Sequence, residues 1–356
     1  MFAITNKLFL QACQKVYIVN YISALGMLIN ILLAIAVIYV YPEVHAIKLV
    51  SACIYLIQPV LYRKYIDKKY LVRKKGKVIG KNVLKNRWSG FAQNLAYFIN
   101  MNTDVAVLTV FMSLSDVSIY SIYMLAIVAL RAIIISLSNS YQGALGKYYA
   151  EGNIGELKSK FKKFEKEFWI ISMALFFTCL LLINPFVKLY TIGVNDADYS
   201  QPIFACVIVI ANLFYCVREP YRLLVLATGR FKETNFGAIM EALLNLLISV
   251  ILVKQMGLIG VAIGTLIAIV YRLLYFIWYL KRDIIYKQYR EYAALFMTIC
   301  IVLLFNIKVY YMHLIHITSI MSFVVYGCVI VFLEILLTVI VYYISDKLCN
   351  SIMKRG

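Results

Sequence analysis

The sequence predicts an all-α, polytopic membrane protein, a bundle of about ten transmembrane helices. Hydrophobic residues make up 63% of its 356 residues, whereas soluble domains contain roughly 45–50%. Charged residues make up only 15%, too few to cover a surface that faces water. Apolar runs long enough to cross a bilayer also recur along the chain. These observations exclude a soluble globular fold.

Ten apolar segments meet the length that a membrane-spanning helix requires, which is about 20 residues for about 30 Å of hydrocarbon. Polar or charged connections separate them, and we number the spans from first to tenth in chain order. The predicted spans cover residues 17–41, 45–66, 89–113, 117–140, 167–187, 201–227, 235–253, 257–280, 291–309 and 319–345.

The basic residues test this assignment, because loops rich in lysine and arginine stay in the cytoplasm. When the connections are assigned to alternate sides, roughly thirty of the 36 basic residues fall on one side, with dense runs in 63–87 and 147–166. This alternation supports ten spans and places both termini in the cytoplasm. It also explains the net charge of +19 by topology, so the charge does not indicate nucleic-acid binding.

Two cytoplasmic connections combine lysines with apolar residues at helical spacing, a pattern typical of a basic amphipathic helix that lies on the membrane surface. The alternative interpretation is a topogenic charge cluster that has no specific ligand. The apolar positions are Ile79, Val83, Leu84 and Trp88 in the first connection, and Leu157, Phe161, Phe164 and Phe168 in the second.

Two hairpins are similar to each other, which indicates an internal repeat. Asn30 precedes Asp67 by 37 residues in the first hairpin, and Asn245 precedes Asp283 by 38 residues in the seventh and eighth spans. If these are repeats, the third to eighth spans form a complete six-helix unit, and the first two spans are the last hairpin of an earlier unit. Four helices of that earlier unit are then absent, so we expect an amino-terminally incomplete chain.

Four segments resemble the polysaccharide repeat-unit flippases (O-antigen and capsule, Wzx-type) of the multidrug/oligosaccharidyl-lipid/polysaccharide exporter (MOP) superfamily. The resemblance covers essentially the whole chain and implies a MATE/MOP-like fold with fourteen helices, of which this chain supplies helices five to fourteen. The segments are QKVYIVNYIS at 14–23, NTDVAVLTVFMSLSDVSIYSIYMLA from Asn102, ATGRFK at 227–232 and GLIGVAIGTLIAIVYR from Gly257.

Together, the repeat and the resemblance imply a domain division. Residues 1–69 form the last hairpin of an incomplete amino-terminal lobe, and 70–88 form a basic amphipathic linker between the lobes. Residues 89–283 form the complete six-helix carboxy-terminal lobe, and 284–356 form an accessory final helix pair with a cytoplasmic tail.

The resemblance also implies a function. The substrate is an undecaprenyl-pyrophosphate-linked oligosaccharide, which alternating access turns from the cytoplasmic to the outer leaflet for surface polysaccharide, such as the O-antigen of lipopolysaccharide or a capsule. The implied location is the bacterial cytoplasmic membrane. The implied partners are this lipid-linked oligosaccharide, membrane lipids and other polysaccharide-assembly proteins.

Polar residues inside the apolar spans form the candidate site, because a charge in hydrocarbon normally faces a cavity or a partner. On the third span Gln93, Asn100 and Asp104 share one helix face with Tyr97, which predicts a wet surface. Asp104 is the residue expected to couple transport to a proton or sodium gradient, since a buried carboxylate can change its protonation during a cycle. No bound cofactor or metal is expected.

Arg131 on the fourth span and Arg272 on the eighth have two interpretations. In the first, both guanidinium groups line a cavity and bind the two phosphates of a lipid pyrophosphate. In the second, they make structural pairs, for example with Glu241. Gly260 and Gly264 share the helix face of Arg272, where small residues allow a neighbouring helix to pack closely.

The sixth span contains a charged segment beside a proline near its cytoplasmic end. Because proline removes a backbone donor and bends a helix, this segment is a candidate hinge for an inner gate. The alternative is ordinary anchoring at the membrane interface. The residues are Arg218, Glu219, Pro220 and Arg222.

The sequence leaves three other function classes as alternatives. An enzyme is disfavoured, because the histidines are expected to lie outside the hydrocarbon and the longest outer loop, near 188–200, holds few catalytic residue types. A multidrug or cationic-solute antiporter of the same superfamily needs an acidic cavity, whereas Arg131 and Arg272 favour an anionic substrate. A nonfunctional truncated remnant is the third alternative.

Overall fold

The protein is described from a computed structural model. The structure describes residues 6–7, 9–10, 13, 15–41, 43–70, 87–283, 289–312, 317 and 319–352. Every long regular element among these residues is an α-helix, which confirms the predicted all-α class. The chain divides into two compact units, Met1–Lys81 and Asn82–Gly356.

The first unit contains a hairpin of two long helices, α2 (Val16–Val40) and α3 (Val44–Lys69). These helices match the first two predicted spans. The hydroxyl groups of Ser23 and Tyr62 lie 2.9 Å apart and join the pair near one end. Most of the large apolar side chains of α2 are exposed, as expected for a helix whose surface faces lipid.

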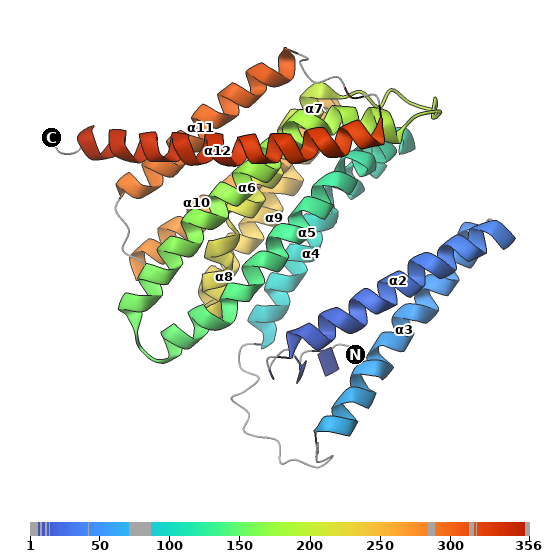
Figure 1. Cartoon of the computed structure of the whole chain (residues 1–356), viewed down its shortest axis with the longest axis horizontal. Helices are drawn as coiled ribbons and strands as arrows, with labels where there is room; N and C mark the ends of the chain where they lie inside the picture. Colours follow the sequence, from blue (N-terminus) through green and yellow to red (C-terminus); the bar gives the residue numbers. More distant parts are fainter. Residues whose placement is uncertain are drawn as a thin grey trace. The chain divides into compact units, whose positions relative to one another are not determined.

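The second unit is a bundle of nine helices within the part of the chain that the structure describes. Long helices alternate in direction along the chain, and Figure 1 shows α5 and α6 as antiparallel neighbours. Helices α11 and α12 pack on each other and on α6. The helices are α4 (Arg87–Phe111), α5 (Leu114–Ala150), α6 (Ile154–Tyr190), α7 (Pro202–Val217), α8 (Glu219–Ala227), α9 (Phe231–Met256), α10 (Leu258–Asp283), α11 (Tyr289–Tyr311) and α12 (Ile320–Ile352).

Within the described residues, nine helical segments are long and apolar enough to cross a membrane, one of them made of α7 and α8 together, and the chain is a multi-pass membrane protein. The third predicted span corresponds to α4, whose described apolar part, Phe98–Phe111, is shorter than a full crossing. The other nine predicted spans each correspond to one of the nine candidate spans.

Helix α6 shows that one of the two surface-helix predictions is wrong. It runs without a break from Ile154, so the basic segment before the fifth span continues into that span. The apolar stripe of that segment is buried against protein: the Phe161 ring lies 5.9 Å from Tyr221 on α8, and the Phe164 ring lies 4.2 Å from Tyr141 on α5. Helical spacing alone does not distinguish a face that meets lipid from one that meets another helix.

The first surface-helix prediction concerns residues 77–88. Residues 71–86 lie outside the described part of the chain, and so does the side chain of Trp88. That interpretation therefore stays a prediction.

The sixth predicted span consists of two helices in the structure. Helix α7 ends at Val217, Arg218 forms a turn, and α8 begins at Glu219. Pro220 lies in the first turn of α8, where its missing N–H group costs no helical hydrogen bond.

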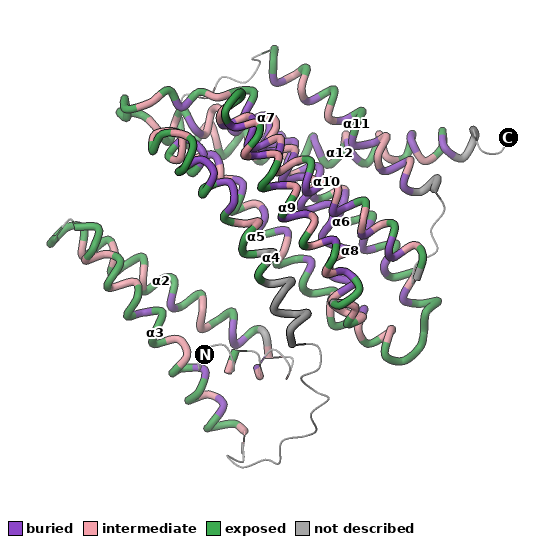
Figure 2. The backbone as a smooth tube through the Cα atoms, turned by 180° about the vertical axis from the view of Figure 1, so that it is seen from behind, coloured by how far each residue is buried: buried purple, intermediate pink, exposed green. Residues whose placement is uncertain are grey.

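The core of the second unit follows α6, α7 and α8. Figure 2 shows buried positions concentrated along α6, α8 and α10. The largest fully buried side chains are aromatic, and they fill the space between the packed helices. They include Trp169, Phe176, Phe204 and Tyr221.

Helices α9 and α10 approach each other closely at two glycines. A Cβ atom added to Gly260 would lie 2.5 Å from the backbone oxygen of Leu252 on α9. A Cβ atom on Gly264 would collide with the side chain of Ser249. These glycines therefore allow the backbones to come together, and they bring the polar side chains of both helices within hydrogen-bond range.

Candidate functional site

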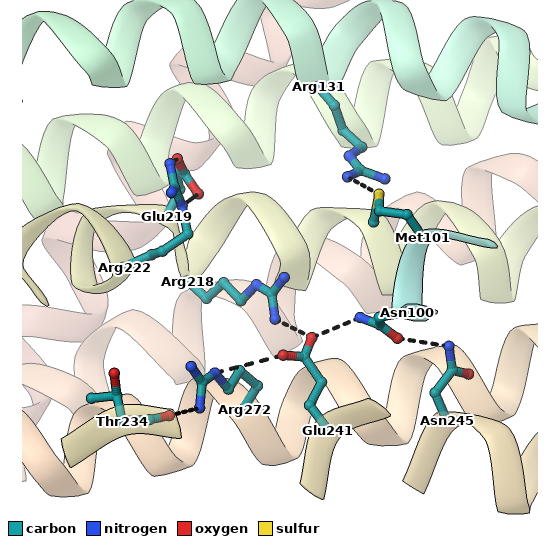
Figure 3. Close-up of polar contacts among 10 residues, drawn as sticks. All are labelled: Asn100, Met101, Arg131, Arg218, Glu219, Arg222, Thr234, Glu241, Asn245 and Arg272. Atoms are coloured by element: carbon teal, nitrogen blue, oxygen red, sulfur yellow. Dashed lines mark hydrogen bonds and ion pairs between the residues drawn. The ribbon is translucent and has the colours of Figure 1, made fainter. Parts of the chain in front are cut away.

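A chain of polar contacts runs through the apolar interior of the second unit. Its side chains come from α4, α9 and α10, which pack along one another, and from α5, the end of α7 and the turn into α8 (Figure 3). At 1.5 Å per residue, Asp104 lies about 10 Å from the end of α4 and Thr265 about 10 Å from the start of α10. Glu241 and Arg272 lie roughly 21 to 22 Å from the turn between α9 and α10. The network therefore extends through the depth of the bilayer rather than along its edge.

The Asp104 carboxylate forms one end of the network. The hydroxyl of Thr265 lies 2.9 Å from both of its oxygens, and the Tyr120 hydroxyl donates to Oδ2 at 2.9 Å. The Asn245 amide donates to Oδ1 at 3.3 Å. The carboxylate is buried, so these donors replace the water that would otherwise solvate it.

An amide bridge joins Asp104 to a second carboxylate. Asn245 donates to Asn100 Oδ1 at 2.8 Å, and Asn100 Nδ2 donates to Glu241 Oε1 at 3.0 Å. Two of the four residues of the predicted polar stripe, Asn100 and Asp104, are therefore part of one network. The side chains of the other two, Gln93 and Tyr97, lie outside the described residues.

Glu241 is shared by two arginines. Arg218 donates to Oε1 of Glu241, and Arg272 Nε lies 3.6 Å from Oε2. Arg272 also donates to the backbone oxygen of Thr234 at 3.0 Å, and its guanidinium group lies 4.2 Å from the ring centroid of Phe276. The structure thus places Arg272 in the structural pair that was one of its two sequence interpretations.

Arg131 differs from the other two buried arginines. It donates to Asn212 Oδ1 at 3.2 Å and to the sulfur of Met101 at 3.4 Å, and its guanidinium group lies 3.7 Å from the ring centroid of Tyr215. Only 8% of the residue is exposed. Among the described residues, no carboxylate forms an ion pair with it. Arg131 is a buried cation held by neutral groups.

The residues predicted to form a hinge lie beside this network. Arg218 contacts Glu241, and the Tyr215 ring lies between Arg218 and Arg131, at 4.3 and 3.7 Å from their guanidinium groups. One turn further, Arg222 pairs with the buried carboxylate of Glu219. The hinge role of this segment stays a prediction.

Sequence reasoning missed several members of the network. Threonine and tyrosine are common in apolar helices, so the sequence did not mark Thr265, Tyr120 or Tyr215 as members of a polar network. Asn245 and Ser249 carried a usable signal, because two polar residues at i and i+4 mark one face of an otherwise apolar span. Ser249 lies 3.2 Å from Asn245 and continues the polar face.

No known protein-family profile matches the chain, and no curated protein sequence matches it. Among solved structures, the chain is similar to one described as the lipid II flippase MurJ in an inward closed conformation, with a TM-score of 0.53 and 18% sequence identity. The chain shares the helical fold of this flippase. The match covers 92% of this chain, and this chain spans 65% of the length of the MurJ structure. The shared fold confirms the polytopic bundle predicted from the sequence.

Proposed function

We propose that this chain takes part in moving a lipid-linked oligosaccharide across the bacterial cytoplasmic membrane, with an undecaprenyl-pyrophosphate-linked repeat unit for surface polysaccharide as the substrate. The chain shares the fold of MurJ, which is described as a lipid II flippase, and this supports the movement of a lipid-linked substrate across the membrane. The burial of Arg131 among neutral groups is the observation that favours a phosphorylated substrate. Flipping needs no covalent chemistry, so the relevant residues are those that bind and position.

The argument from Arg131 is electrostatic. A charge inside hydrocarbon costs about 2.5 to 3.5 kcal/mol on insertion scales, and a nearby counter-charge offsets that cost. Arg218 and Arg272 share the Glu241 carboxylate, whereas Arg131 makes no ion pair with a carboxylate among the described residues. A phosphate group would supply the missing charge and accept two parallel hydrogen bonds from the guanidinium fork. Arg131 is therefore the residue assigned to the pyrophosphate, while Arg272 and Arg218 hold Glu241 in place.

A binding measurement on the purified full chain tests this assignment. Arg131→Ala should weaken binding of undecaprenyl pyrophosphate in detergent by roughly tenfold, the loss expected for one charge-assisted contact. Arg282→Ala removes an equal charge from the exposed end of α10 and should leave the affinity unchanged. Equal affinities of the wild type and a folded Arg131→Ala protein would remove Arg131 from the substrate site.

The Asp104 end of the network is proposed to couple transport to a proton or sodium gradient. The Thr265 hydroxyl oxygen lies 2.9 Å from both Asp104 oxygens and 3.3 Å from the Asn245 amide oxygen, and hard cations such as sodium prefer oxygen ligands. A proton that neutralises the carboxylate would change the same contacts. Sodium and the proton would both act at the Asp104 carboxylate. A measurement that varies the sodium concentration at fixed pH tests the first, and one that varies pH at fixed sodium tests the second.

Asp104→Asn distinguishes this role from a structural one. The amide keeps one oxygen to accept from Thr265 and Tyr120 but carries no charge, so thermal stability should change little. The response of substrate binding to sodium at fixed pH, or to pH at fixed sodium, should disappear. A variant that keeps the full response of the wild type to both ions would exclude Asp104 as the coupling group.

Export of a cationic solute is the second candidate, and one observation favours it. Five carboxylates are buried among the described residues, against three buried arginines, so the interior also holds sites for a cation. The two candidates differ in their ligands. Saturable binding of a lipophilic cation such as tetraphenylphosphonium, lost in Asp104→Asn and indifferent to Arg131→Ala, would favour this candidate. The five residues are Asp104, Glu165, Glu219, Glu241 and Glu334.

A further inference from the structure

A groove lies between α5 and α6, away from the polar network, at the end where these helices are joined. Its volume is about 310 Å³. Tyr141 and Tyr148 on α5 and Lys160 and Lys163 on α6 line it, and the stacked rings of Tyr141 and Phe164 form part of its wall. All of these residues belong to the second unit.

The position of the groove along the helices corresponds to the level of lipid headgroups. Tyr141 follows the start of α5 by 27 residues (141 − 114), and Lys163 precedes the end of α6 by 27 residues (190 − 163). At 1.5 Å per residue both lie about 40 Å from the opposite helix ends. The hydrocarbon is about 30 Å thick, and the bilayer with its headgroup regions is about 40–45 Å thick. The groove is thus level with one headgroup layer.

The charge of the groove suits an anion. Glu167 also lines the groove, and its carboxylate lies 3.9 Å from Lys163, so the charge of Lys163 is partly compensated. Lys160 makes no ion pair within the described part of the chain. Lys158, Lys162 and Lys166 lie on the same stretch of α6 and add to the positive potential.

The lining also suits a lipid rather than a free ion. Tyrosine is favoured where an apolar environment meets water, because its ring packs on apolar groups while its hydroxyl bonds polar ones. Here aromatic rings lie beside ammonium groups in one concavity. A phospholipid headgroup presents that same combination, a phosphate attached to an apolar glycerol and acyl region.

We propose that this groove binds the headgroup of an anionic phospholipid, with Lys160 and Lys163 contacting the phosphate and Tyr141 and Tyr148 packing beside the glycerol. The site is independent of the proposed transport of a lipid-linked oligosaccharide. Its occupant belongs to the surrounding leaflet and bridges the ends of α5 and α6.

The test uses the full chain in phosphatidylcholine nanodiscs that contain a small fraction of spin-labelled phosphatidylglycerol. Lys160→Gln/Lys163→Gln should weaken association of the labelled lipid at least fivefold. Lys158→Gln/Lys162→Gln removes two charges from the same helix without altering the lining, and it should change the affinity less than twofold. Ala144→Trp fills the groove without changing any charge and should weaken association as strongly as the first pair.

Four outcomes would overturn the proposal. Equal losses in both lysine pairs would mean attraction by overall charge and no defined site. Unchanged binding in Lys160→Gln/Lys163→Gln or in Ala144→Trp would mean that the lipid binds elsewhere. Displacement of the labelled lipid by equimolar inorganic phosphate would identify a free-phosphate site. Displacement of the labelled lipid by polyglutamate from the wild type, with no polyglutamate binding to Lys160→Gln/Lys163→Gln, would identify an acidic protein as the occupant.

Discussion

At the scale of single residues, the three arginines that are buried among the described residues of the second unit have different environments. Arg218 and Arg272 share Glu241, whereas Arg131 is surrounded by an amide, a thioether and an aromatic ring. The sequence identified Arg131 and Arg272 as unusual because each lies in an apolar span, but it gave both the same two interpretations. The packing of α9 against α10 brings Glu241 to Arg272, and no ion pair joins Glu241 to Arg131 among the described residues.

Glu241 is predicted to be essential for stability. Glu241→Gln leaves Arg218 and Arg272 buried without a carboxylate, and breaking a buried pair on one side costs about 3 to 5 kcal/mol. The free energy of unfolding of the variant in detergent, measured by a denaturant titration, should fall by about that amount.

Glu167→Gln is the matched control, because its carboxylate pairs with Lys163 on an exposed surface. Its effect should be below about 1 kcal/mol. Equal effects of the two substitutions would mean that the Glu241 pairs contribute no more than a surface ion pair does.

At the scale of helices, the sequence predicted the number, order and approximate bounds of the spans well. It missed the continuation of α5 to Ala150 and the start of α6 at Ile154, because charged residues at those positions resembled a loop or a surface helix. The charges lie on the outer faces of two helices whose apolar faces meet each other. Hydropathy windows average over both faces and therefore end the helices too early.

The contact between α9 and α10 gives a prediction at this scale. Gly260→Ala places a Cβ atom 2.5 Å from the Leu252 backbone oxygen, so the helices must separate, and overpacking of this kind costs about 1 to 3 kcal/mol. The thermal midpoint of the purified variant should fall. The polar network should also loosen, since Asn245 and Thr265 lie on these helices.

Gly143→Ala on α5 is the control for that measurement. A Cβ atom at Gly143 meets nothing within 4 Å, and alanine is the better helix former by about 0.5 to 1 kcal/mol. Its midpoint should stay the same or rise. A Gly260→Ala midpoint equal to that of Gly143→Ala would contradict the close approach of α9 and α10.

At the scale of the whole molecule, hydropathy and charge alternation predicted the polytopic helical class, and the arrangement of its helices was expected only from the internal repeat and the family resemblance. The similarity to the MurJ structure agrees with the helical fold. The chain spans 65% of that structure, and the described polar network lies entirely within the second unit. The substrate was less predictable, since composition does not distinguish a phosphorylated lipid from a cationic solute. The guanidinium of Arg131, which makes no ion pair within the described part of the chain, is the feature that favours the lipid.

The most direct measurement locates lipid-linked repeat units in the organism that encodes this chain. Deletion of the gene should leave these units in the cytoplasmic leaflet and remove the surface polysaccharide. The wild-type gene should restore the polysaccharide, and the Arg131→Ala gene, expressed to the same level, should not. Surface polysaccharide that persists undiminished after the deletion, with no cytoplasmic accumulation of lipid-linked units, would contradict the proposed function.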